Sequence, residues 1–492
     1  MKPALNLGAW RYLNGSDGGP ALELPAEHLV THGVVVGMTG SGKTGLVTVL
    51  IEEAAKAGVP TLVVDVKGDL PNLLLAFPDF DAQRLEPWVE AERDSTAEEV
   101  AERARVAAEK RRAELESWGI GEEELAAYAN SIHVRVLTPG GSAGEALHML
   151  SSLERRSPRW DSDPEAARDA LSAAVSLVLR LLGREPDPAK SREHVLLSVL
   201  AERRLAAGES AELAELMQDV LEPPIDQIGA LSVNAYIKVS ERKSLAAAMN
   251  SLLASPSLAS WRQGTTLDVA EWVEPKQGKT PIVVISVAHL DDEERTLVLG
   301  VLLEEVLSWV RSLPGSQRLR ALLVFDEVYG FLPPHPANPP TKRPVVALMK
   351  QARAFGVGVI VATQNPMDLD YRALSNAGVW CLGRLQTDAD RARVIDGLAA
   401  VRGSEDVTGD IDTTLQRLAP RWFVIRNTHA GPPLLMQPRY AMTYMRGPMT
   451  RVEIRKARGV KEPVRVETPT PGAAAAAAPT QTQLVGPFAS GK

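Results

Sequence analysis

The segment Gly37-Met-Thr-Gly-Ser-Gly-Lys-Thr44 decides how the rest of this sequence is interpreted. It fits the phosphate-loop pattern G-x-x-x-x-G-K-[ST] at every fixed position. An apolar, β-branched run at 34–36 precedes it and predicts a buried strand, and the apolar spacing over 46–55 predicts a helix. A strand, a glycine-rich turn and a helix together surround nucleotide phosphates with backbone N–H groups and the positive end of a helix dipole.

The pattern also assigns side-chain roles within this segment. Lys43 is expected to reach the β- and γ-phosphates, and the Thr44 hydroxyl is expected to hold Mg²⁺. We therefore predict a site for ATP and Mg²⁺. The residues expected to bind ATP are Gly37, Thr39, Gly40, Ser41, Gly42, Lys43 and Thr44.

Two other predicted strands end in carboxylates. Four apolar residues at 322–325 run into Asp326 and Glu327, which fits a strand that delivers acids to the phosphate end of a sheet. We expect Asp326 to hold the hydration shell of Mg²⁺ and Glu327 to orient or deprotonate the attacking water. The alternative is a strand that simply ends at an acidic pair facing solvent. The strand at 61–65 ends in Asp65, and Asp69 follows; these acids either face the metal, or Asp69 only caps the next turn.

Polar residues follow the later strands as well. Gln364 comes directly after a predicted strand at 356–363, where its amide can bond the γ-phosphate or the attacking water. Arg384 ends the strand at 378–383, and Arg353 lies in a predicted helix at 345–355. The proline-rich loop at 331–344 is either a stiff connector or a loop that faces a partner or DNA.

Composition limits the class of protein. The chain has 492 residues, of which 45% are hydrophobic and 24% are charged, as in ordinary globular proteins. Its formal net charge of -8 argues against a protein whose whole surface is positively charged for binding nucleic acid. A local basic channel remains compatible with this net charge. Cys381 is the single cysteine, which suits a reducing compartment. The sequence has neither a signal-peptide pattern nor an apolar run of roughly 18 residues. We expect a cytoplasmic protein without a membrane partner.

The pattern along the chain predicts an α/β fold with a mostly parallel sheet and a large helical insertion. We expect a lead-in at 1–30 and a core formed by 31–84 and 268–450. The insertion spans 85–267, is mostly helical, and contains one core strand near 132–137. A basic segment and a disordered tail occupy 451–492.

These motifs together resemble the HerA/FtsK superfamily of ring ATPases, and most closely its HerA-like members with a helicase central domain. The resemblance rests on 37–44, Asp65-Val-Lys-Gly-Asp69, Phe325-Asp-Glu327, Lys350-Gln-Ala-Arg-Ala-Phe-Gly356 and Ala362-Thr-Gln364. It implies a RecA-like P-loop core that hydrolyses ATP with Mg²⁺, assembles as a hexameric ring and translocates or remodels double-stranded DNA.

The resemblance also implies roles for individual residues. Lys43 and Glu327 would be catalytic, and Gln364 would be the sensor of the γ-phosphate. Arg384 is similar in placement to an arginine finger that acts on the neighbouring subunit, and Arg353 is the competing candidate.

One departure from the family affects the expected partners. HerA carries a β-barrel before its ATPase that serves nuclease partners, whereas about 36 residues precede the phosphate loop here. Docking to a nuclease, or to another protein partner, is therefore left open. The main rival interpretation is a nucleotide-switched, ring-forming scaffold that moves no DNA. A small-molecule kinase that uses the same loop is a weaker third.

Overall fold

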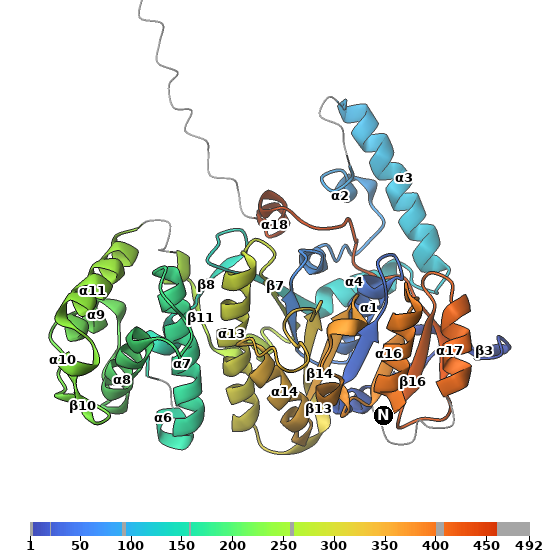
Figure 1. Cartoon of the computed structure of the whole chain (residues 1–492). Helices are drawn as coiled ribbons and strands as arrows, with labels where there is room; N and C mark the ends of the chain where they lie inside the picture. Colours follow the sequence, from blue (N-terminus) through green and yellow to red (C-terminus); the bar gives the residue numbers. More distant parts are fainter. Residues whose placement is uncertain are drawn as a thin grey trace, which may run out of the picture.

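One large sheet crosses the molecule (Figure 1). The computed structural model describes residues 3–19, 21–90, 95–156, 159–255, 260–399 and 408–459. Within them the sheet has 13 strands in the order β11-β8-β7-β12-β6-β13-β14-β5-β15-β16-β17-β2-β3. In that order the strands span Thr265–Thr266, Glu145–His148, Ile132–Pro139, Thr280–Ser286, Thr61–Asp65, Ser316–Asp326, Phe355–Thr363, Gly33–Val36, Val379–Leu382, Phe423–Asn427, Leu434–Pro438, Gly8–Tyr12 and Asp17–Gly19.

The sheet is parallel from β11 to β15, and β16, β17, β2 and β3 extend it with antiparallel pairs. The central strands β5 and β6 are buried along their whole length. Their near-continuous runs of Val and Leu are what a parallel strand covered on both faces requires. The predicted α/β fold with a mostly parallel sheet is confirmed.

Helices cover both faces of this sheet. On one face, α1 (Lys43–Lys56) packs its apolar residues against inward-pointing residues of β5, β6 and β12. On the other face, α13 (Asp292–Ser312) and α14 (Lys342–Gln351) contribute to a second hydrophobic cluster. Short 3₁₀ segments connect these elements, namely η1 (Ala26–Thr31), η2 (Leu70–Leu74), η4 (Ala352–Ala354) and η5 (Pro366–Asp368).

The insertion predicted at 85–267, together with short helices at its two boundaries, contains two groups of helices. One group extends the α13 face, where α7 packs along α13; its members are α5 (Ser151–Glu154), α6 (Arg159–Ser162), α7 (Pro164–Leu181), α8 (Arg192–Ala206), α9 (Leu213–Leu221), α10 (Val233–Tyr236), α11 (Val239–Ala254) and α12 (Val269–Val273). A small hairpin, β9 (Gln227–Ile228) with β10 (Leu231–Ser232), lies among them. The sheet takes three strands from this region, β7, β8 and β11, where the sequence indicated one.

The second group stands apart. Helix α3 (Ala97–Glu116) projects from the body beside α2 (Ala82–Leu85) and is followed by α4 (Glu122–Ser131) (Figure 1). Thr96 and Glu99 form a capping box that fixes the start of α3. Most of this helix is polar and exposed, with Ala104, Ala108, Arg111 and Leu115 buried.

Both ends of the described chain pack against the core. The pair β1 (Ala4–Asn6) and β4 (Glu23–Pro25) lies at the N-terminus, and β2 joins the main sheet through β17. The C-terminal part contributes α15 (Tyr371–Leu374), α16 (Asp388–Ala399), α17 (Thr408–Arg417) and α18 (Arg451–Ala457). The tail predicted to be disordered lies, from residue 460 on, outside the described residues.

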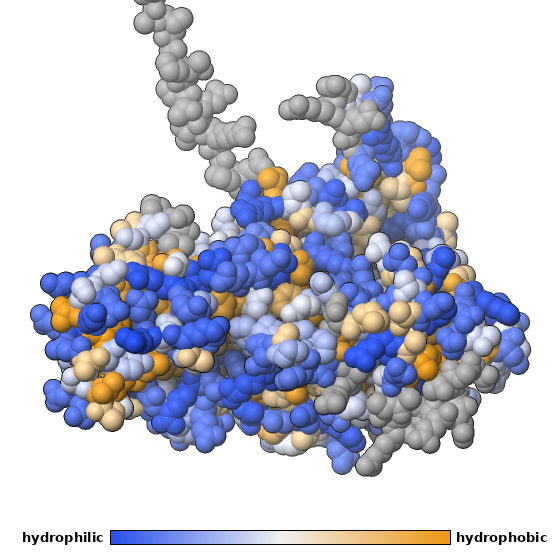
Figure 2. All heavy atoms as spheres, viewed as in Figure 1, coloured by the Kyte–Doolittle hydropathy of each residue, from blue (hydrophilic) through white to orange (hydrophobic). Residues whose placement is uncertain are grey.

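The face seen in Figure 2 is mostly hydrophilic, and hydrophobic residues appear there as small separate groups. Among the described residues, no helix combines the length and the apolar character that crossing a membrane requires.

Candidate functional site: a nucleotide site at the carboxyl edge of the sheet

The carboxyl ends of the parallel strands gather the predicted site at one edge of the sheet. Strand β5 ends at Val36, directly before the glycine-rich loop, and β14 ends at Thr363. Strands β6 and β13 end at Asp65 and Asp326, which lie opposite each other in register. Ligands of open α/β sheets bind at this edge, so the topology brings together residues that are up to about 300 positions apart in the chain.

The glycine-rich loop is held by neighbouring strand ends. The backbone N–H of Gly37 donates to the Thr363 carbonyl at 3.2 Å, and that of Met38 donates to the Arg384 carbonyl at 2.8 Å. Gly42 has a φ of 91°, and a Cβ on it would lie 3.2 Å from the Arg421 Cα. A side chain at Gly42 would therefore be strained and crowded, whereas glycine leaves the loop backbone free to approach phosphates.

Lys43 begins α1 and points at the acids of β13. Its side chain is 3% exposed, and Nζ lies 3.3 Å from Glu327 Oε2. Burial lowers the pKa of Lys43, although the neighbouring Glu327 and Asp326 carboxylates oppose this shift. A buried ammonium at the positive end of a helix strongly favours an anionic ligand. The ligand supplies the negative charge that offsets the cost of burying the ammonium.

Glu327 accepts hydrogen bonds on both carboxylate oxygens. Oε1 accepts from the Thr363 hydroxyl at 2.9 Å and from the Gln364 backbone N–H at 3.1 Å. Oε2 accepts from Lys43 at 3.3 Å and from Lys67 at 2.6 Å. Burial alone would raise the pKa of Glu327, but the two ammonium groups and these hydrogen bonds hold it below its ordinary value. The side chain is therefore an ionised carboxylate, the form that a general base needs.

Asp326 has a different environment from Glu327. It is 1% exposed, and neither Oδ1 nor Oδ2 has a hydrogen-bond partner among the described residues. Burial is the main cause that raises the pKa of Asp326. Buried carboxylates without partners are rare, and a divalent cation with its waters would satisfy both oxygens. Asp326 and the Thr44 hydroxyl at the start of α1 thus fit the Mg²⁺ that accompanies a bound nucleotide.

Gln364 lies between the glycine-rich loop and Glu327. Its side-chain Oε1 accepts from the Thr39 hydroxyl at 2.9 Å, while its backbone N–H bonds Glu327. The structure therefore brings Thr39, Lys43, Asp326, Glu327 and Gln364 into one cluster.

The two acids at and just after the end of β6 have different surroundings. Asp65 is fully buried, and it accepts from the Ser286 hydroxyl at 2.8 Å and from the Gly68 N–H at 2.9 Å. Burial raises the pKa of Asp65 to about 7. Asp69 makes no side-chain capping bond to η2. Asp65 thus anchors the turn at 66–69.

Sequence reasoning did not single out two residues of this cluster, Lys67 and Thr363. Both were visible in the quoted motifs, since Lys67 lies between Asp65 and Asp69 and Thr363 precedes Gln364. The signal that would have found them is their position at the end of core strands.

The two candidate arginines lie at opposite ends of the parallel strands, Arg384 at the carboxyl ends and Arg353 at the amino ends. Arg384 is exposed and follows β15, and its carbonyl bonds the glycine-rich loop of the same chain. Arg353 lies in η4, before the first residue of β14, and lines a pocket of about 530 Å³ together with Lys350 and His429. At roughly 3.3 Å per residue, the nine residues of β14 separate Arg353 from the glycine-rich loop by about 26 Å.

The proline-rich loop directs its cations toward the body of the protein. Lys342 Nζ lies 3.3 Å from an Asp370 carboxylate oxygen, and Arg343 pairs with Asp169 of α7. Both cations of this loop are thus engaged within the chain.

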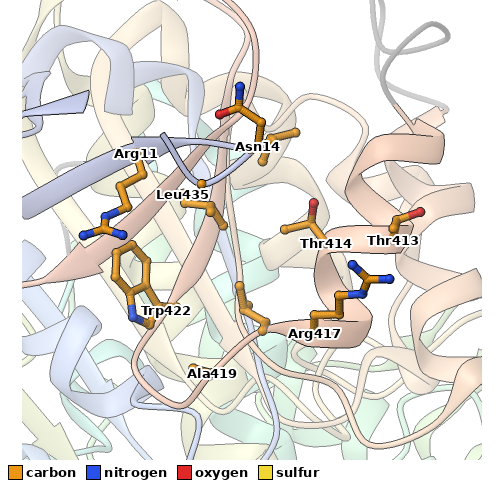
Figure 3. A pocket seen from close by; sticks show the side chains of 11 residues that line it. Arg11, Asn14, Thr413, Thr414, Arg417, Ala419, Trp422 and Leu435 are labelled. Carbon is orange, nitrogen blue, oxygen red and sulfur yellow. The ribbon is translucent and has the colours of Figure 1, made fainter. Parts of the chain in front are cut away.

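A pocket that the sequence did not indicate lies between the β2–β3 hairpin and α17 (Figure 3). It has a volume of about 520 Å³. The Arg11 guanidinium lies beside the Trp422 ring, 5.7 Å from its centroid. The preceding residue, Arg421, donates its N–H to the Ser41 carbonyl at 3.0 Å, so this wall of the pocket is joined to the phosphate loop.

Fold and site together define a nucleotide-binding P-loop protein with a RecA-like fold. Residues 20–138 match the family model "Helicase HerA, central domain", which confirms the resemblance to the HerA/FtsK superfamily. A search of the curated proteins finds no match.

A solved structure shows the same fold, and a second is similar to this chain. VirB4 of Thermoanaerobacter pseudethanolicus is 14% identical, with a TM-score of 0.51 over 89% of this chain and 96% of VirB4. The plasmid coupling protein TrwB in complex with ADP and Mg²⁺ is also 14% identical, with a TM-score of 0.48 over 87% of this chain and 89% of TrwB.

Proposed function

We propose that this protein is a Mg²⁺-dependent ATPase of the HerA/FtsK type that works as a hexameric ring and translocates or remodels double-stranded DNA. The observation that carries the hydrolytic part is the cluster at the carboxyl edge of the sheet. It combines a buried lysine in a phosphate loop, a buried carboxylate with no partner in the described chain, and an ionised glutamate beside them. This is the set of groups that hydrolysis of a nucleoside triphosphate requires.

Each residue of the cluster has one task in this proposal. Backbone N–H groups of 37–44 and the Lys43 ammonium bind the phosphates. Mg²⁺, held by Thr44 and Asp326, would neutralise charge on the phosphate oxygens. Glu327 accepts a proton from the attacking water. Gln364, beside Thr39 of the glycine-rich loop, orients that water or the γ-phosphate.

The arginine that completes such a site comes, in this proposal, from a neighbouring subunit. Arg353 lies about 26 Å from the phosphate loop of its own chain, by the length of β14, so it is out of reach of its own nucleotide. Neither Arg353 nor Lys350 has an ion-pair partner among the residues that the structure describes. Arg384 accepts a bond from Met38 of its own glycine-rich loop through its backbone carbonyl, so its position beside the nucleotide of the same chain suits a role within that subunit. We therefore favour Arg353 as the finger.

We also assign the ATPase core to 31–84 and 268–450, with the mostly helical region 85–267 inserted between its strands. Support comes from the sheet, because these two segments supply the strands from β12 to β17 as well as β5 and β6. Strands β7, β8 and β11 of the inserted region join the same sheet.

The hydrolytic part is tested by replacing Glu327 with Gln. The amide keeps the size of the side chain but is not a base, so we expect ATP turnover to fall by roughly 10²- to 10⁴-fold while nucleotide binding is retained. Steady-state phosphate release and binding of a fluorescent nucleotide measure the two quantities. The matched control is Glu271→Gln, which alters an exposed glutamate paired with Lys276. Undiminished turnover in Glu327→Gln would contradict the role given to Glu327.

The DNA part rests on the match to a helicase domain, and it has its own test. We expect duplex DNA to accelerate ATP turnover at low salt and to lose this effect as salt is raised, because phosphate contacts weaken as counterions compete. ATP-dependent displacement of a DNA-bound roadblock would then report movement.

The second candidate function is a ring-forming scaffold, or an ATPase that regulates a protein partner such as a nuclease, without DNA translocation. It is favoured by the net charge of -8 and by the engagement of Lys342 and Arg343 within the chain. ATP turnover that is indifferent to duplex DNA at every salt concentration, together with ATP-dependent assembly in gel filtration, would select this alternative.

A further inference from the structure

Lys67 makes the closest ion pair to the proposed general base. It lies in the turn at 66–69 after β6, and its Nζ is 2.6 Å from Glu327 Oε2. The corresponding distance for Lys43, the lysine of the phosphate loop, is 3.3 Å. The Lys67 side chain is 31% exposed and that of Glu327 is 11% exposed, so the pair is largely shielded from solvent. A charge-assisted hydrogen bond of this length is among the strong ones in proteins.

The four donors around Glu327 occupy its acceptor positions. An ionised carboxylate offers about four lone-pair sites, and Thr363, Gln364, Lys43 and Lys67 fill them two to each oxygen. A bound triphosphate attracts Lys43, which frees one site. Lys67 follows the neighbouring strand β6 at the same edge of the sheet, in a turn that carries no phosphate-binding motif. On Oε2, the bond that remains after nucleotide binding is therefore the one from Lys67.

We propose that Lys67 is a positioning residue that restrains Glu327 and limits the rate at which the bound nucleotide is hydrolysed. The inference rests on the proposed ATPase function. Hydrolysis at full rate requires Glu327 Oε2 to leave Lys67 and accept a hydrogen bond from the attacking water. While the ion pair persists, the turn at 66–69 sets the orientation of the carboxylate.

The turn that carries Lys67 is tied to the C-terminal segment. The Met449 N–H donates to the Gly68 carbonyl at 2.9 Å, and the Asn72 side-chain amide donates to the Gly447 carbonyl at 2.7 Å. The same segment is anchored on α1, where the guanidinium of Arg439 pairs with Glu52 and Glu53 at 2.8 and 2.9 Å. A displacement of residues 445–449 would therefore move the Lys67 turn relative to Glu327, which gives the C-terminal segment a route to the catalytic base.

The first experiment replaces Lys67 with Ala in the full chain and measures ATP turnover without DNA. We expect kcat to rise on the order of 3- to 10-fold, because one strong hydrogen bond to the base is removed, while KM for ATP and fluorescent-nucleotide affinity stay unchanged. Lys67→Arg, which keeps a charged donor, should restore the low rate. The matched control Lys276→Ala breaks an exposed Lys–Glu pair of 2.9 Å and should leave kcat unchanged. A kcat for Lys67→Ala at or below the wild-type value overturns the proposal.

A second measurement does not depend on catalysis. A double-mutant cycle of Lys67→Ala and Glu327→Gln, followed by urea unfolding of the nucleotide-free protein, should give non-additive shifts of the unfolding midpoint. Additive shifts would show that the pair has no energetic coupling, and would overturn the restraint while leaving the ATPase proposal intact. Conversely, wild-type turnover in Glu327→Gln overturns the proposed function itself, whatever the cycle shows.

Discussion

Glu327 has a backbone conformation that is rare for its residue type. Its φ is 66°, in the left-handed region that non-glycine residues seldom adopt. Such strain costs of order 1–3 kcal/mol and persists where the surroundings hold the residue in place, as the four donors to its carboxylate do here. The neighbouring Asp326 ends β13 with regular geometry. The sharp change between the two residues lets Asp326 face the Mg²⁺ position that we propose, while Glu327 faces Lys43 and Lys67.

A second buried acid, Glu304 of α13, lets stability be tested at the residue scale. It is 9% exposed, and burial raises its pKa to about 7, with Arg343 and Arg311 opposing the shift and Asp169 and Glu305 adding to it. Its pKa is thus higher in the folded than in the unfolded state. The stability that this difference contributes is fully present below pH 4.5 and is lost as the pH rises through about 7.

We therefore predict that Glu304→Gln becomes relatively more stable as the pH rises. The amide carries no charge to desolvate, so the difference in unfolding free energy between variant and wild type should grow by about 2 kcal/mol from pH 5.5 to pH 8. Urea unfolding at both pH values measures this difference. The exposed Glu116→Gln serves as the control. A difference between Glu304→Gln and wild type that is the same at both pH values would show that Glu304 does not titrate in this range.

At the scale of elements, the segment after β17 ties the C-terminal region to the phosphate-loop helix. Arg439 is 4% exposed and reaches Glu52 and Glu53 on α1, and Glu52 also accepts the N–H groups of Met442 and Thr443. Breaking a buried ion pair by removing one partner typically costs about 3–5 kcal/mol, so this contact fixes the segment firmly on α1. Arg439 therefore has a structural role, since it holds the segment after β17 on α1.

The sequence predicted the elements whose patterns are local and missed those that depend on distant pairing. Strands β5, β6, β12, β13, β14 and β15 appear as buried apolar runs, and the phosphate loop, Asp326, Glu327 and Gln364 follow from their position at strand ends. Strands β8 and β11 have four and two residues, which is too short for a periodic signal. Lys67 escaped notice because its importance lies in a contact with a residue 260 positions away.

At the scale of the molecule, the proposed site is split between two edges of one sheet. The phosphate loop and its acids lie at the carboxyl ends of the strands, and Arg353, Lys350 and His429 line a pocket at the opposite edge. A single chain cannot bring the two edges together, because β14 separates them by about 26 Å. Head-to-tail contacts, in which one edge meets the opposite edge of the next copy, generate closed rings when the rotation closes. The split site is therefore the feature of this chain that favours a ring.

Subunit mixing tests this arrangement without knowledge of the ring size. Lys43→Ala and Arg353→Ala should each abolish turnover, since loss of an arginine finger typically costs 10³- to 10⁵-fold. In a 1:1 mixture, an active interface needs a Lys43 from the Arg353→Ala subunit and an Arg353 from the neighbouring Lys43→Ala subunit. About a quarter of the interfaces of a head-to-tail ring meet this condition, so about a quarter of the wild-type turnover should return. The control pairs Lys43→Ala with Arg384→Ala. Arg384 and Lys43 serve the same nucleotide from the same chain in our proposal, so that mixture should stay inactive. Recovery in the control mixture, with none in the Arg353 mixture, would transfer the finger to Arg384.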